Sequence, residues 1–226
     1  VLVTGVQTCA LPIFTDTFSV MFDSTYIAAN LNGVYLGTTI YAQPNAISFI
    51  ACGVGENKNY GIYALLATTL TISGGSIEGN GVGGSGPFVG GIYVSGGPNG
   101  AAQVSMSGVY FEDNAGTADV WIDNTSSPGS SSFSGCTFNR IRNTSYVTNN
   151  IYATASAGMI NKVSIQGCGF QGFNTYSPSA GRPYLNTSGT GAQMSWSACF
   201  FGSTVETPII SNYIAGGTGA ASLLRV

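Results

Sequence analysis

One pattern of apolar and polar positions occurs six times along the chain and predicts its fold. The clearest copy is Val163–Phe170. In every copy a large apolar residue follows a Ser or Thr, and it precedes a Gly or Ala by two positions and another apolar residue by five. The first apolar positions are Phe49, Ile72, Met106, Phe133, Ile165 and Trp196. Their separations of 23, 34, 27, 32 and 31 residues are typical of a solenoid whose loops absorb the differences.

Each copy is interpreted as a strand, a bend and a second strand, because its spacing lacks the helical period. Both apolar positions are expected to point inward, the later ones being Val54, Ile77, Phe111, Phe138, Phe170 and Phe201. So short a unit cannot bury both strands alone. Copies stacked about 4.8 Å apart would form one continuous core. The sequence therefore predicts an all-β fold, a parallel β-helix of about seven coils.

A further strand precedes most copies and carries an aromatic residue. Alternation along this strand directs Ile62, Ile92, Val120 and Ile151 inward and an aromatic file outward. The outward residues are Tyr63, Tyr93, Trp121 and Tyr152. Two interpretations stay open: the file stiffens the sheet by cross-strand stacking, or it is an exposed platform that binds sugar rings.

Cysteine and asparagine also recur at fixed positions of the repeat. Cys52, Cys136, Cys168 and Cys199 follow the first apolar position by three residues, which favours inward-facing thiols over disulfides or a metal site. An asparagine follows it by eight residues in three copies, at Asn57, Asn80 and Asn114. Because asparagine tolerates turns and bonds to neighbouring backbone, these three predict a structural ladder.

The repeated apolar-x-(Gly/Ala)-Cys-x-Phe pattern resembles the coils of the right-handed, single-stranded, pectin-lyase-like β-helix family, from about Thr17 to Ile214. The resemblance implies a right-handed solenoid, and lyases, glycosidases, phage tailspikes and adhesins share that fold. The histidine motif of polygalacturonases is missing, since the chain contains no histidine. The basic residues also do not align with the acids as they do in pectate lyases. These two departures from the family pattern argue against pectin cleavage.

Four carboxylates are the candidate catalytic residues. Asp119 and Asp123 are expected on the outward face beside Trp121, about 13 Å apart, which is too far for a glycosidase pair at about 5–9.5 Å. Glu78 and Glu112 occupy equivalent positions on adjacent coils, about 5 Å apart. A protonated carboxyl beside an ionised one is what acid-catalysed glycosidic cleavage requires. The alternative for this pair is a solvated rim on which the side chains splay apart.

The first residues are interpreted separately. Val3–Ile13 resembles the translation of a sequencing-library adapter, so residues 1–13 are interpreted as a sequencing or assembly artefact, with a short native strand ending at Pro12 as the alternative. Residues 14–226 are then the β-helix domain, a fragment of a longer protein.

The composition excludes some classes of function. Charged residues are only 7% of the chain, against about 25% in ordinary domains. The net charge of −3 and six scattered basic residues argue against nucleic acid. No apolar run reaches the roughly 20 residues of a membrane helix.

The similarity to phage tailspike and tail-fibre β-helices implies a domain that binds bacterial surface polysaccharide, and the sequence predicts no cofactor or metal. The same similarity implies a homotrimer, cleavage of the bound glycan, and a place on the phage tail or outside the cell. The alternatives are a non-catalytic adhesin or structural domain, and a secreted polysaccharide lyase or glycosidase.

Overall fold

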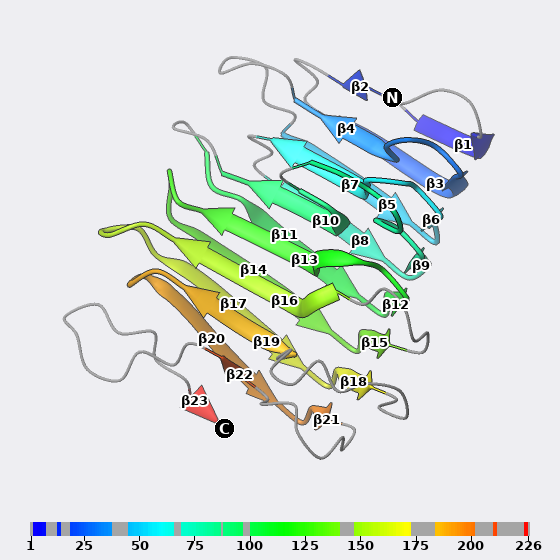
Figure 1. Ribbon diagram of the computed structural model, residues 1–226. Helices are drawn as coiled ribbons and strands as arrows, with labels where there is room; N and C mark the ends of the chain where they lie inside the picture. The colour runs from blue at the N-terminus through cyan, green and yellow to red at the C-terminus, as the bar shows by residue number, and fades with distance from the viewer. Residues whose placement is uncertain are drawn as a thin grey trace.

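The chain folds as an all-β solenoid of parallel strands (Figure 1). The computed structural model describes residues 2–7, 13–14, 19–37, 45–65, 69–86, 88–96, 100–140, 147–172, 184–201, 210–211 and 224–225. Within these residues the only regular secondary structure is the β-strand, and there is no helix that could cross a membrane. The stack runs from the N-terminal strands in blue to the C-terminal strands in red.

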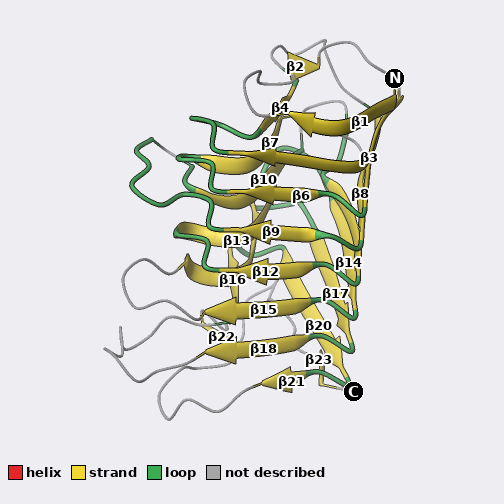
Figure 2. Ribbon diagram, turned by 90° about the vertical axis from the view of Figure 1, so that its right-hand side faces the viewer, coloured by secondary structure: helices red, strands yellow, loops and turns green. Residues whose placement is uncertain are grey.

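Three faces surround the core, and each coil visits them in the same order. The first face contains β5 (Ala46–Ile50), β8 (Thr69–Ser73), β11 (Gln103–Ser107), β14 (Gly129–Ser134), β17 (Asn161–Gln166), β20 (Ala192–Ser197) and β23 (Leu224–Arg225). The second contains β6 (Gly53–Gly55), β9 (Ser76–Glu78), β12 (Tyr110–Glu112), β15 (Thr137–Arg140), β18 (Gly169–Gly172) and β21 (Phe200–Phe201), stacked in Figure 2. The third contains β2 (Ile13–Phe14), β4 (Val34–Leu36), β7 (Tyr60–Leu65), β10 (Gly90–Ser95), β13 (Gly116–Asn124), β16 (Val147–Ala155), β19 (Leu185–Ser188) and β22 (Ile210–Ser211).

One long strand, β3 (Ser19–Ala28), joins the first two faces, because its first half pairs with β5 and its second half with β6. Strand β1 (Leu2–Gln7) also pairs with β3 in parallel. The interpretation of residues 1–13 as an artefact stays a prediction. The solenoid has about five turns rather than about seven, and the strands β2, β22 and β23 near its ends are only two residues long.

The expected core is confirmed in the described coils. Phe49, Ile72, Met106, Phe133 and Ile165 are buried, whereas Trp196 is partly buried and packs against the core. Equivalent residues stack along the axis. The Phe111, Phe138 and Phe170 rings are almost parallel, with centroids 4.6 and 4.8 Å apart. The side chain of Phe201 lies outside the described residues.

The bend between the first two faces explains the small residue of the repeat. This position has a positive φ in all six copies: Ala51, Gly74, Gly108, Gly135, Gly167 and Ala198 lie between 50° and 63°. A left-handed backbone is unfavourable for large or β-branched side chains and free for glycine. The Gly/Ala position is therefore a requirement of the backbone.

A buried asparagine ladder forms the turn between the second and third faces, as predicted. The Asn57 side-chain amide donates to Asn80 Oδ1 at 2.9 Å, and Asn80 donates to Asn114 Oδ1 at 2.9 Å. All three side chains are essentially inaccessible to solvent. The ladder satisfies backbone groups that the turn would otherwise leave unpaired.

The thiols allow a labelling prediction. Cys52, Cys136, Cys168 and Cys199 are free, and the first three are buried whereas Cys199 is only partly buried. Burial raises the pKa of Cys52 and of Cys199, so these two thiols are mostly protonated rather than reactive thiolates. In peptide mapping after alkylation of the native protein, we expect Cys199 to react first and the other three only on unfolding. Equal, rapid labelling of all four would contradict this core.

Candidate functional site

The predicted aromatic file runs along the outer side of the third face. Tyr63, Tyr93, Trp121 and Tyr152 lie in register on β7, β10, β13 and β16. Successive ring centroids are 5.0, 5.1 and 5.2 Å apart. Tyr35 extends the stack beyond Tyr63, at 5.4 Å. These contacts join neighbouring coils.

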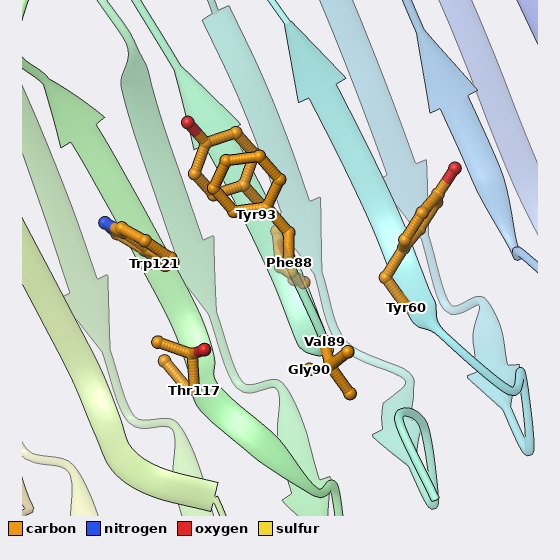
Figure 3. Close-up of a pocket in the computed structure, with 9 residues that line it drawn as sticks. Tyr60, Phe88, Val89, Gly90, Tyr93, Thr117 and Trp121 are labelled. Carbon is orange, nitrogen blue, oxygen red and sulfur yellow. The ribbon is translucent and has the colours of Figure 1, made fainter. Parts of the chain in front are cut away.

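The middle of the aromatic file is covered by Phe88 from the loop before β10. Figure 3 shows the Phe88 ring over Tyr93, with the centroids 4.0 Å apart. Phe88 also contacts Tyr63 and the edge of Trp121. Tyr93 is consequently only 6% exposed, and the small apolar pocket under Phe88 has room for one water molecule at most. A sugar ring therefore has no open face of Tyr93 to stack on.

Asp123 accepts hydrogen bonds that hold side chains of this aromatic file in place. The Tyr93 hydroxyl donates to Asp123 Oδ2 at 2.9 Å, and the Thr154 hydroxyl donates to Oδ1 at 3.0 Å. Trp121 Nε1 in turn donates to the Thr154 hydroxyl at 3.1 Å. Burial has the largest effect on the pKa of Tyr93 and raises it, and the nearby Asp123 carboxylate raises it further. The Tyr93 hydroxyl therefore stays protonated and remains a donor. These hydrogen bonds give Asp123 a structural role, as an acceptor that links Tyr93 and Thr154.

Asp119 does not share the outward face with Asp123, and that expectation is wrong. Asp119 is 1% exposed, and its carboxyl accepts hydrogen bonds from the side-chain amides of Asn114 at 2.8 Å and Asn150 at 2.5 Å. The strand begins at the corner between the second and third faces, where the ladder of asparagines lies. Strand alternation therefore does not decide the surroundings of this residue.

The second acidic pair lies as the repeat predicts. Glu78 and Glu112 are register partners on β9 and β12, and both line a groove on the second face. The Tyr110 hydroxyl donates to Glu112 and accepts from Asn139 at 2.9 Å. Burial and the contact with Glu112 raise the pKa of Tyr110.

Three further residues of this acidic groove were missed from the sequence: Tyr26, Glu56 and Asp113. Glu56 and Asp113 both follow the first apolar position of their repeat by seven residues, a signal that was available. Tyr26 precedes the first repeat, and only the pairing of β3 with β6 brings it to the groove.

The Tyr26 ring lies against the backbone of β6 at the two glycines of that strand. A Cβ on Gly53 would lie 2.5 Å from Tyr26 Cδ2, and one on Gly55 would lie 3.5 Å from its hydroxyl oxygen. The ring packs on the β6 backbone, and 47% of the residue is exposed. Tyr26 is therefore partly exposed to solvent in the groove that Glu56 and Glu78 also line.

Comparison of the chain with known protein families, with curated proteins and with solved structures finds no match. Within the described ranges, no group of three or more cysteine and acidic side chains is placed to hold a metal ion. For binding a ligand, the acidic groove has an aromatic side chain, carboxylate acceptors and a tyrosine hydroxyl.

Proposed function

We propose that this solenoid is a polysaccharide-binding domain and that glycan lies in the acidic groove of the second face. The observation that carries the proposal is the exposed Tyr26 ring, supported by glycine backbone and flanked by carboxylates. Sugar rings combine an apolar face, which stacks on an aromatic ring, with hydroxyls that donate to carboxylate oxygens. This arrangement suits a neutral, hydroxyl-rich chain.

The repeat spacing supports a ligand that is itself a polymer. Glu78 and Glu112 present the same group on successive coils, about 4.8 Å apart, which is close to the length of one sugar unit. A glycan lying along the axis would meet one coil per sugar. As for the tailspike β-helices that the sequence resembles, the ligand would be bacterial surface polysaccharide.

Cleavage of the bound glycan is the second candidate activity. Two carboxylates on adjacent strands, about 5 Å apart, approach the roughly 5–5.5 Å separation of retaining glycosidases. In this mechanism Glu78 and Glu112 would divide the roles of nucleophile and general acid. Tyr110 holds the Glu112 carboxyl in place through its hydroxyl.

Binding to capsule and O-antigen polysaccharides by calorimetry tests the site. We expect Tyr26→Ala to weaken binding about tenfold, equivalent to about 1.4 kcal/mol, because the stacking surface is lost. Trp121→Ala is the matched control on the third face and should bind as the wild type does. The opposite ranking would place the glycan on the aromatic file and refute the groove.

Reducing-end release from the same preparations separates an enzyme from a binding module. If the groove cleaves, Glu112→Gln should abolish release and retain binding. If the wild type binds but releases no reducing ends from any ligand, the domain is a non-catalytic receptor-binding module.

A further inference from the structure

The buried ladder changes its source of side chains at β13. In the preceding coils an asparagine of the turn fills the ladder, and the second residue of the next third-face strand is a glycine. A Cβ on Gly61 would lie 3.1 Å from Asn80 Cγ, and one on Gly91 would lie 3.4 Å from Asn114 Cγ. On β13 and β16 the strand itself supplies the ladder, through Asp119 and Asn150.

The hydrogen bonds of the ladder converge on Asp119. From the N-terminal side each amide donates to the next residue, ending with Asn114 Nδ2 to Asp119 Oδ1 at 2.8 Å. From the C-terminal side Asn150 Nδ2 donates to Asp119 Oδ2 at 2.5 Å. Among side chains of this size, only an ionised carboxyl has two acceptor oxygens and no donor.

The two sides differ in how firmly their direction is set. Asn80 Oδ1 also accepts from the Asn57 backbone amide at 3.2 Å, and Asn80 Nδ2 also donates to the Val54 carbonyl at 2.9 Å. Turning this amide over would break both bonds. Asn150 Oδ1, in contrast, is buried and accepts no hydrogen bond from the residues that the structure describes, so its amide can turn over without losing one of these bonds at that oxygen.

We propose that Asp119 and Asn150 form a pH-sensitive switch inside the solenoid. With Asp119 ionised, Asn150 donates to it and the ladder converges. When a proton from solvent binds Asp119 Oδ2, the new O–H donates to Asn150 Oδ1 and the Asn150 amide turns over. The ladder then runs in one direction from Asn57 to Asn150, and no charge is buried at its centre.

The surroundings of Asp119 determine whether the protein becomes more or less stable as the pH falls. Burial raises its pKa to about 6, against the lowering effect of the two amide donors. Arg140, at the end of β15, lowers the pKa, and Asp113, in the turn after β12, raises it. The neighbouring strands β10 and β16 contain no charged residue. Because the folded protein holds this proton more tightly than the unfolded chain, stability rises as pH falls through about 6 and levels off below about 3.9.

Unfolding by urea at several pH values tests the switch. Between pH 7.5 and 5 we expect the unfolding equilibrium constant of the wild type to fall about tenfold through this group. Asp119→Asn resembles the protonated form, so it should lose this dependence and be no less stable than the wild type at pH 7.5. Glu112→Gln, which removes a groove carboxyl, should retain the dependence. A flat wild-type profile, or an unchanged profile in Asp119→Asn, overturns the proposal.

A second measurement follows the switch directly in the folded wild type. In NMR spectra we expect the Asp119 carboxyl carbon and the Asn150 side-chain amide to titrate together, with a midpoint at about pH 6. Asn150→Ala removes one donor to the anion and should move the Asp119 midpoint upward. An Asn150 amide that does not respond, or an Asp119 carbon that does not titrate between pH 5 and 7.5, also overturns the switch.

Discussion

Replacing Phe138 by alanine is expected to lower the free energy of unfolding by about 3–5 kcal/mol. Phe138 is completely buried and lies between the rings of Phe111 and Phe170, at 4.6 and 4.8 Å. Its removal would leave a cavity against two flat rings that belong to different coils. Since the strands that carry these rings are held by sheet pairing, the core can collapse only partly into the space.

Urea unfolding followed by circular dichroism measures this loss. Phe200→Ala is a matched control, because the same residue type on β21 is 63% exposed and its truncation should change stability by less than about 0.5 kcal/mol. Phe138→Leu should lie between the two. Equal effects of Phe138→Ala and Phe200→Ala would mean that the second face is packed the other way round.

Replacing Asn80 by alanine is expected to cost about 3 kcal/mol, although only one polar side chain is removed. Asn80 accepts from the Asn57 backbone amide and side chain, and donates to the Val54 carbonyl and Asn114 Oδ1. These partners are buried, and each buried group left without a partner costs about 1–3 kcal/mol. The loss should appear in the same urea experiment as a lower midpoint with an unchanged slope.

Asn59 supplies the comparison for the ladder. Its side chain is half-buried, and its amide donates to Asn32 at 2.9 Å while its oxygen accepts from the Ser85 backbone. Because water can replace these partners, Asn59→Ala should cost only about 1 kcal/mol. If Asn80→Ala were as mild as Asn59→Ala, the ladder would contribute little to stability.

The repeat alone determined the fold, the inward side of each strand and the structural ladder. A period-two strand has only two sides, and a pattern repeated in six copies identifies the inner one without any tertiary information. The small residue at the bend was also visible, and the positive φ of Gly135 and its equivalents gives its physical cause. The register of Glu78 with Glu112 followed from the same repeat.

Only the tertiary structure decided what surrounds the candidate residues. Alternation predicts that Asp119 and Asp123 share one side of β13, but Asp119 lies at the corner where the asparagine ladder runs and is buried among asparagine amides. The path of a loop carries Phe88 onto Tyr93, and no periodicity describes a loop. Tyr26 reaches the groove because β3 bends from one face to the next. Strand period predicts which side most residues face, whereas corners, loops and long strands determine what they meet there.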